Sequence, residues 1–260
     1  MKKLNLIPLL FASLLFSAFA VHRNNTIADW HLKGKVKSII QQEYMLQQGH
    51  EVCVGKHVYS FDDKGNITLQ RSLNSRDSID FPDSRWSYKY NNLNNKTEEI
   101  IYNIDGSVSW RTVYNYDKNN QLAVASRYHR EGQLEERYAY KRNDKKTLLE
   151  EVSYNSLDSI NNKTSYKYDV LGNETEEATD FSYIKWLDRS QTVSKYDAAE
   201  NLLEYMVYDS SGTVKESNKN SYNKFDSAGN WTRNTSVKYS RDYLRKLDTV
   251  IFVREISYYQ

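Results

Sequence analysis

The chain has 260 residues, with 36 Lys and Arg against 34 Asp and Glu, 22 Tyr and a single Cys. This near balance of charge gives a phosphate backbone no long-range attraction, which argues against nucleic acid as the main partner. The lone Cys53 excludes an internal disulfide, so stability must come from burial and hydrogen bonding.

The first twenty residues have the order of a secretory signal. Lys2 and Lys3 precede an apolar run that ends with small residues at Ala18 and Ala20. The run is shorter than the roughly 20 residues that span a bilayer, so we expect residues 1–20 to be a cleaved signal peptide. Cleavage leaves 34 basic against 34 acidic residues, and no Cys follows to take a lipid. The mature chain is therefore predicted to be exported, periplasmic or extracellular, with no membrane anchor.

The mature chain is expected to form one domain. Residues 21–33 are interpreted as a polar N-terminal tether, and residues 34–260 as a single β domain. The segment "GKVKSIIQQEYML" from Gly34 should be the strand that starts the sheet, and "DTVIFVREISYY" from Asp248 should be the last strand. No stretch rich in Pro, Gly or Ser separates the segments between them.

A degenerate phrase, clearest as "YKYDVLGNETEE" from Tyr166, recurs at spacings of 24 to 29 residues. A second, weaker turn lies halfway through several of the units, as in "YNIDG", "YHREG" and "YDSSG". Each unit therefore predicts two strands and two turns. The seven units begin at Tyr59, Tyr88, Tyr114, Tyr138, Tyr166, Ser194 and Asn223.

The turn inside the phrase can be interpreted residue by residue. In "FDDKG", "YDVLG" and "FDSAG" an Asp can accept backbone N–H bonds, and the Gly three residues later suits a positive φ. Seven residues occupy this position in the seven units. Six of them are residue types that tolerate the left-handed region, and Glu200 is the exception. The phase holds Gly65, Asn94, Asn120, Asp144, Gly172, Glu200 and Gly229, and the half-unit turns hold Gly106, Gly132 and Gly212.

Strand alternation agrees with these turns. After one turn, Leu122, Val124 and Tyr128 have equal parity, which predicts one common face. Residues 134–141 and 198–206 favour helix by local propensity, but the repeat places them in strands, and we follow the repeat.

About fourteen to sixteen strands follow from the repeat. A flat meander of that many strands would be ~70 Å long, and its apolar face would be on the order of 1,200 Å², more than a soluble monomer leaves bare. We expect an all-β fold: a repetitive antiparallel β-hairpin meander, curled or two-layered, built from about seven units. Tyr and aliphatic side chains should lie inside, with Lys, Glu and Asn outside.

The phrases "YKYDVLGN" from Tyr166 and "YNYD" from Tyr114 resemble the YD-repeat (Rhs-type) family, and the chain looks like a small exported Bacteroidetes-like member. The resemblance extends from about residue 55 to 235. It implies a strip of hairpins, which in large members winds into a shell around a toxic cargo. No self-cleavage motif or cargo segment follows the last unit here, so encapsulation is not expected.

A search for chemistry finds no catalytic set. The doubled acids, such as Glu150-Glu151 and Glu176-Glu177, point to opposite faces of a strand, so no doublet is a carboxylate pair by itself; each acid is expected to be solvated opposite a basic residue. His50, Cys53 and His57 form a weak metal cluster for a strand and turn. Phosphate-binding and metalloprotease motifs are absent. We predict no enzyme activity, no metal and no cofactor.

The sequence favours an exported non-enzymatic binding or scaffold module of the cell envelope, which presents a Tyr- and Trp-rich sheet to a polymer such as a glycan, or to a protein. The candidate binding rings are Trp86, Trp110, Trp186 and Trp231, although a place in the core explains these residues more readily. One alternative is a structural protein that assembles through sheet edges. Another is an enzyme with a site at residues 180–191, the largest break in the repeat.

Overall fold

The structure is a computed structural model that describes residues 26–27, 30–74, 84–143, 145, 147–181, 189–239 and 246–260. Sixteen strands occur in these ranges, and no helix there is long and apolar enough to cross a membrane. The strands are β1 (Val36–Gln47), β2 (His50–Phe61), β3 (Ile67–Asn74), β4 (Ser84–Tyr90), β5 (Lys96–Tyr102), β6 (Val108–Tyr116), β7 (Leu122–His129), β8 (Leu134–Arg142), β9 (Leu148–Asn155), β10 (Ile160–Tyr168), β11 (Glu174–Asp180), β12 (Ser190–Tyr196), β13 (Leu202–Tyr208), β14 (Val214–Phe225), β15 (Trp231–Tyr239) and β16 (Lys246–Tyr258).

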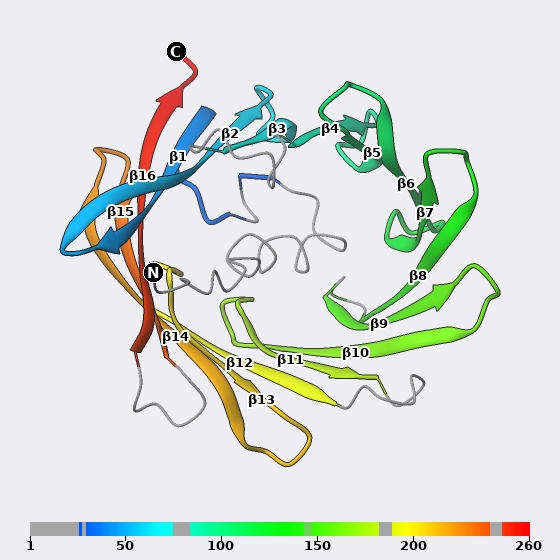
Figure 1. Ribbon diagram of the computed structural model, residues 1–260. Helices are drawn as coiled ribbons and strands as arrows, with labels where there is room; N and C mark the ends of the chain where they lie inside the picture. The colour runs from blue at the N-terminus through cyan, green and yellow to red at the C-terminus, as the bar shows by residue number, and fades with distance from the viewer. Residues whose placement is uncertain are drawn as a thin grey trace, which may run out of the picture.

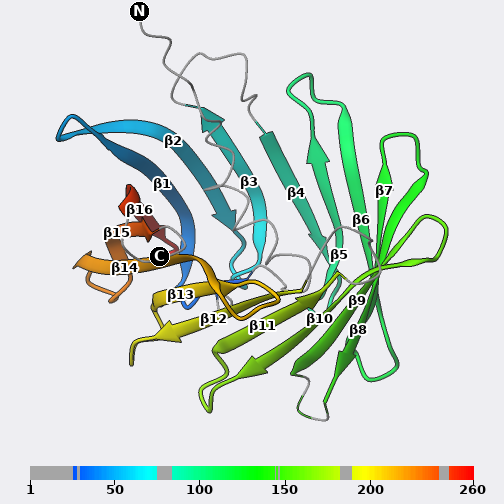
Figure 2. The ribbon, with the colours of Figure 1, turned by 60° about the horizontal axis from the view of Figure 1, so that its bottom comes forward.

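The strands form one closed antiparallel barrel. Each strand pairs with its neighbours in sequence, and β16 returns to pair with β1 (Figure 1). The closing register joins Ile39 to Ile256 and Tyr44 to Ile251. Turning the molecule shows the strands as a continuous inclined wall (Figure 2). Among the described strands, therefore, the sheet has no free edge.

The predicted all-β class is confirmed, but the predicted curled or two-layered sheet is wrong. β1 and β16, of 12 and 13 residues, pair from Val36 to Met45. That pairing satisfies two rows of backbone N–H and C=O groups that an open meander would leave exposed. Closure also hides one face of the sheet, which removes the need for a second layer.

The turns follow the predicted chemistry. Asp62 Oδ1 accepts the N–H groups of Lys64 and Asn66 at 3.0 and 2.8 Å. Asn91, Asp117, Asn155, Asp169, Asp197, Asp209 and Asp226 each accept the equivalent pair. Positive φ is confirmed at Gly65, Asn94, Asn120, Gly172, Glu200, Gly229, Gly106, Gly132 and Gly212. Asp144 lies outside the described residues, and the positive φ of Asp158 marks a half-unit turn that the sequence did not reveal.

Beside each of these turns the pairing register shifts by one residue. The side chains that follow the shift therefore point to the opposite face of the sheet from the one that strict alternation predicts. Leu122 packs with Tyr114 and Ala125, whereas Val124 and Tyr128 pair with β6 residues on the other face. The predicted common face of Leu122, Val124 and Tyr128 is therefore wrong for Leu122. The cause is a bulge, because one residue of β7 has no partner in β6 and the alternation reverses there.

Some tyrosine hydroxyls link neighbouring hairpins. In four places a Tyr hydroxyl donates to the carbonyl of a residue at the start of an earlier strand, so the ring is half-buried while its polar end is satisfied. The pairs are Tyr90 to Ile67 at 2.8 Å, Tyr116 to Lys96 at 2.7 Å, Tyr196 to Glu174 at 3.0 Å and Tyr222 to Leu202 at 2.9 Å.

The N-terminal segment, residues 26–27 and 30–34, lies within the ring of strands (Figure 1). Its Trp30 packs edge-on against Tyr59, with ring centroids 4.6 Å apart, in the main hydrophobic cluster. The backbone N–H of Ile27 donates to the carbonyl of Gly65 at 2.9 Å. A Cβ at Gly65 would lie 2.7 Å from Ile27, so that glycine serves both the turn and this contact. The segment covers the side of the interior formed by β1 to β3.

Gly172→Ala tests the turn geometry. Gly172 has φ 91°, and no atom lies within 4 Å of its would-be Cβ, so the substitution adds backbone strain alone. We expect it to lower the free energy of unfolding by about 1 to 2 kcal/mol, with a smaller loss for Gly172→Asn. Urea unfolding midpoints measure the difference. Gly55→Ala, at a strand position without positive φ, is the control, and an equal loss there would contradict the explanation.

Candidate functional site

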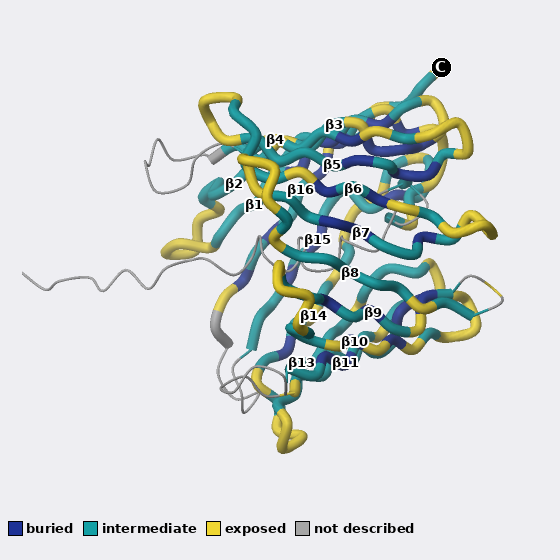
Figure 3. Tube along the Cα trace, turned by 90° about the vertical axis from the view of Figure 1, so that its right-hand side faces the viewer, coloured by how far each residue is buried: buried dark blue, intermediate teal, exposed yellow. Residues whose placement is uncertain are grey.

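The two faces of the barrel differ in chemistry. Alternate residues of a barrel strand face the interior, and here that face carries the buried Tyr88, Tyr114 and Tyr166. Lys89 and Lys167, of opposite parity, are 69% and 70% exposed. Burial is concentrated within the strands and exposure at the hairpin ends (Figure 3). We call the interior face of β5 to β11 the inner wall; it is the candidate functional site.

The outer face is crossed by ion pairs between neighbouring strands. Burial alone would raise the pKa of Glu98, but its hydrogen bonds from Lys89 and Arg111 outweigh that effect and the pKa is lowered. Further outer pairs are Lys163–Glu150 at 2.7 Å, Lys167–Glu176 at 2.9 Å, Lys195–Glu204 at 3.1 Å and Lys219–Glu204 at 3.6 Å. The outer face of these strands is therefore charged.

The inner wall begins at a buried cation. Lys96 is 1% exposed, and its Nζ lies 3.3 Å from Glu99 Oε2. The same Nζ lies 4.5 Å from the centroid of the Tyr114 ring and 5.7 Å from that of Tyr88. The Tyr114 hydroxyl donates to Glu99 at 3.1 Å. A carboxylate and two aromatic faces therefore compensate the desolvation of the ammonium group.

Further along, the inner wall is acidic. Glu136, Glu151 and Glu177 lie on β8, β9 and β11, and the Tyr138 hydroxyl donates to Glu136. Burial raises the pKa of Glu151 to about 7, and the negative charges of Glu177 and Glu136 add to the shift. Close to neutral pH, this wall can therefore hold or release a proton at Glu151.

On the side of the interior away from the inner wall, the space is filled by a cluster around Arg254. Its Nε donates to Gln41 Oε1 at 2.9 Å, and its guanidinium lies 3.5 Å from the centroid of the Trp231 ring and 5.9 Å from that of Trp30. Burial lowers the pKa of Arg254 to about 10, so the group stays charged at neutral pH. This cluster fastens the N-terminal segment and fills the interior beside it.

The predicted binding rings separate into two places. Trp86 and Trp110 both pair with Ile101 of β5, and the Trp110 ring lies 5.0 Å from His129. Trp231 lies in the Arg254 cluster, away from that pair. Trp186 lies outside the described residues, as does most of the predicted enzyme region at 180–191, of which 182–188 are not described.

The residues of the weak metal cluster, His50, Cys53 and His57, do not form one site. His57 bonds to Glu43 at 3.0 Å and to Ser72 at 2.8 Å, and Cys53 donates to the Gly55 carbonyl at 3.6 Å. Within the described part of the chain, no three His, Cys, Asp or Glu side chains come together in a way that could hold a metal ion.

Sequence reasoning missed the inner carboxylates, which it treated as solvated. Glu150 and Glu176 do pair with Lys on the outer face, but Glu151 and Glu177 face inward with Thr164 and Tyr166. The doublet itself is the signal that could have found them. One of two adjacent acids in a strand must point to the enclosed face once the sheet closes.

The comparisons with known proteins concern the fold. No family model matches the chain, and no curated protein matches it. A porin-like protein from Bacteroides uniformis is 10% identical and matches with a TM-score of 0.59, covering 87% of this chain and 99% of that one. A porin-like protein from Bacteroides vulgatus is 13% identical, with a TM-score of 0.31 over 86% and 98% of the two chains. A TcdB2-TccC3-Cdc42 structure is 10% identical, with a TM-score of 0.32 over 84% of this chain and 15% of that one.

These findings correct the predicted family. Assignment to the YD-repeat (Rhs-type) proteins is wrong, because no family model matches and the structural likeness with a TM-score above 0.5 is to a porin-like barrel. The physical reason is that the tyrosine and turn phrase specifies only a hairpin with its bulge, which a closed barrel uses equally well. At 10% identity this likeness describes the fold and not the activity.

Glu151→Gln tests the acidic wall. The folded pKa of about 7 exceeds the ordinary 4.5, so the native state holds a proton that the unfolded chain has lost between those pH values. The free energy of unfolding should therefore fall by on the order of 3 kcal/mol as pH rises through this range. Urea unfolding at pH 5 and pH 8 measures the fall. The substitution should remove it, whereas Glu150→Gln on the outer face should retain it; equal pH dependence in both variants would contradict the assignment.

Proposed function

We propose that the protein is an exported, non-enzymatic binding protein that works in water and holds an elongated polar ligand, a neutral glycan, along its inner wall. The observation that carries this proposal is the difference between the two faces of the sheet, with tyrosines and buried carboxylates inside and exposed Lys–Glu ion pairs outside. Hydroxyl and carboxylate groups on a rigid wall suit a ligand rich in hydroxyls, and aromatic rings suit the apolar faces of sugar rings.

Export rests on the predicted signal at residues 1–20, which lie outside the described residues. The partner and the aqueous location are proposals that the outer face supports. A membrane barrel needs an apolar outer band, and each Lys or Arg at the bilayer midplane costs ~2–4 kcal/mol. Six outward cations occur in the outer ion pairs named above, so embedding this wall in lipid would be costly.

The alternative of assembly through sheet edges loses its basis, because β1 pairs with β16 along the whole closing register.

A binding site on the inner wall instead requires entry through an end of the barrel. The N-terminal segment packs against the β1 to β3 side, and the inner wall of β5 to β11 is the surface that we propose for the ligand.

Vesicle flotation tests the aqueous location. The mature protein without detergent should stay at the bottom of a density gradient when mixed with vesicles of neutral and anionic phospholipid, because its outer ion pairs favour water. Light scattering on the same sample should show a concentration-independent mass. Flotation with the vesicles, or a requirement for detergent to remain in solution, would contradict the proposal.

A panel of neutral oligosaccharides, screened on an array and followed by calorimetry, tests ligand binding. Glu176 and Glu177 are adjacent in β11 but face outward and inward, so they form a matched pair. Glu177→Gln should weaken binding of the best oligosaccharide about tenfold, through loss of a charged acceptor. Glu176→Gln should leave it unchanged. Absence of binding to every oligosaccharide, or equal losses in both variants, would overturn the proposed function.

A further inference from the structure

The inner wall is not equally buried along its length. Near the end of the barrel that holds the turns after β4 and β6, Lys96, Tyr114 and Leu122 are 1%, 4% and 6% exposed. Near the opposite end, which holds the turns after β5 and β7, the inward side chains of Arg127 and Glu136 are 32% and 29% exposed. We call the first the packed end and the second the exposed end. A ligand in the interior can touch the charged groups of the inner wall at the exposed end.

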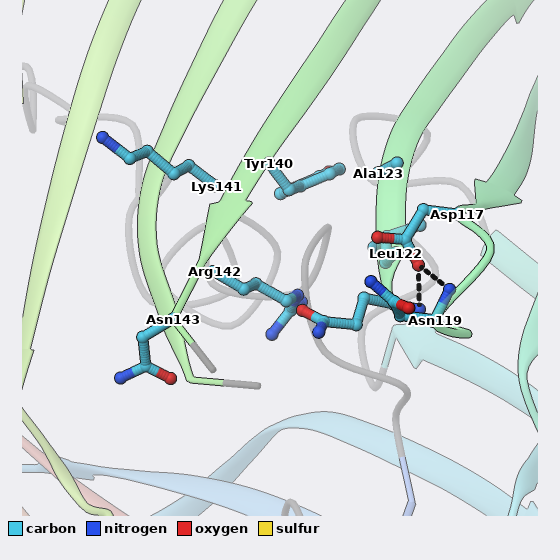
Figure 4. Close-up of a pocket in the computed structure, with 9 residues that line it drawn as sticks. Asp117, Asn119, Leu122, Ala123, Tyr140, Lys141, Arg142 and Asn143 are labelled. Carbon is cyan, nitrogen blue, oxygen red and sulfur yellow. Dashed lines mark hydrogen bonds between the residues drawn. The ribbon is translucent and has the colours of Figure 1, made fainter. Parts of the chain in front are cut away.

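A hollow at the packed end does not expose the inward hydroxyl beside it. The hollow has a volume of about 370 Å³ and lies between the turn after β6 and the end of β8. In Figure 4, Tyr140 and Arg142 reach from β8 toward Leu122 and Asn119 of the neighbouring hairpin. Because the Tyr140 hydroxyl is buried, a ligand in this hollow would not reach it.

The N-terminal segment adds to the packing of the same end. Besides its bond to Gly65 in the turn after β2, it contacts two further turns there. His31 Nδ1 lies 2.5 Å from Glu200 Oε2, in the turn after β12. The Lys33 N–H donates to Asn230 Oδ1 at 2.7 Å, in the turn after β14. These contacts fix the segment at the packed end, where it is an obstacle to a ligand.

Four inward side chains near the exposed end, Trp110 of β6, Arg127 of β7, and Glu136 and Tyr138 of β8, form what we call the mouth cluster. Arg127 pairs with Glu136 on one side and with the buried Thr112 on the other, so these residues share a face. The Arg127 guanidinium lies 4.3 Å from the centroid of the Trp110 ring. The Tyr138 hydroxyl donates to Glu136. The ring therefore holds the guanidinium, and the hydroxyl holds the carboxylate.

The two charges of the mouth cluster lie side by side without a hydrogen bond between them. Arg127 Nη1 is 3.7 Å from Glu136 Oε2, which is longer than the about 2.7–3.2 Å of an N–H···O bond. A guanidinium carries several N–H donors, and a carboxylate accepts several bonds. Both groups therefore keep hydrogen-bonding capacity for a ligand, and together they carry no net charge.

Two adjacent hydroxyl groups of a sugar fit this pair. One hydroxyl oxygen can accept from Arg127 while the neighbouring hydroxyl donates to Glu136, and both bonds are strengthened by the protein charge. An anion would meet the carboxylate, and a cation would meet the guanidinium. A free amino acid carries both charges and is the competing ligand, but the inner wall continues with tyrosines and carboxylates, which suit a longer chain of hydroxyls.

We infer that the mouth cluster binds the terminal residue of the glycan through two adjacent hydroxyl groups, with Arg127 as donor and Glu136 as acceptor. The inference rests on the proposed function and deepens it, because it names the sugar groups that are recognised and the end at which the glycan enters. Trp110 is a positioning residue in this site, since its ring holds the guanidinium.

Titration calorimetry on the mature protein, with the best oligosaccharide of the neutral panel, tests the site. Arg127→Met should weaken binding about tenfold, because it removes the charged donor and keeps an apolar contact with the ring. Arg137→Met is the matched control. Arg137 is 30% exposed and its guanidinium lies 4.2 Å from the centroid of the Tyr154 ring, with the opposite parity to Tyr138. The control should lose similar stability in urea and keep full binding.

Versions of the same oligosaccharide that lack one hydroxyl of the terminal residue identify the bonded groups. Loss of the hydroxyl that accepts from Arg127 should weaken binding to the native protein about tenfold, and binding to Arg127→Met less than twofold, because the bond is already gone. The neighbouring hydroxyl should show the same relation, with a smaller loss, in Glu136→Gln. A merely structural role of Arg127 would weaken the binding of every version equally.

The outcomes separate this inference from the proposed function. If Glu177→Gln weakens binding but Arg127→Met does not, or if Arg127→Met and Arg137→Met lose binding equally, the inference is overturned and the proposed function stands. Additive losses with the deoxy versions have the same meaning. Binding of glycine or alanine in place of any sugar would overturn the sugar class. If no oligosaccharide binds, both fail.

Discussion

Eight hairpin turns of the barrel depend on one local interaction, the acceptance of two backbone N–H groups by a single Asp or Asn oxygen. Asp169 Oδ1 accepts from Leu171 and Asn173, both at 2.9 Å, and Gly172 between them takes the left-handed conformation. The bonds fix the chain reversal and the bulge together. Because the same geometry recurs at these turns, the strands that they join meet with a register shift beside the turn.

The bulge decides which side chains are enclosed. By reversing the alternation once, it turns the first residue after the turn inward, as for Leu122, and sends the aliphatic and tyrosine positions further along to the outer face. Lys and Glu of neighbouring strands then pair on the outer face. Inside, Glu99 is satisfied by Lys96 and by the Tyr114 hydroxyl, and burial favours a proton on Glu151.

The N-terminal segment is an irregularity in an otherwise repetitive barrel. It fills one side of the interior through Trp30 and Arg254, whereas the inner wall of β5 to β11 lies apart from that cluster. A perfectly regular barrel would have presented the same side chains at every hairpin, with no position distinguished from another.

The sequence by itself determined the local geometry: the all-β class, the turn phases from Gly65 to Gly229, and the long strands at each end. These depend on residues within a few positions of each other, which a repeated phrase displays directly. Only the tertiary structure decided closure, the reversal of faces at Leu122, the inward position of Glu151 and Glu177, and the placement of Trp86 and Trp110 on either side of Ile101. Closure joins residues 36–45 to residues 250–258, and contacts between segments so far apart depend on the summed twist and tilt of every strand between them, which no short pattern encodes.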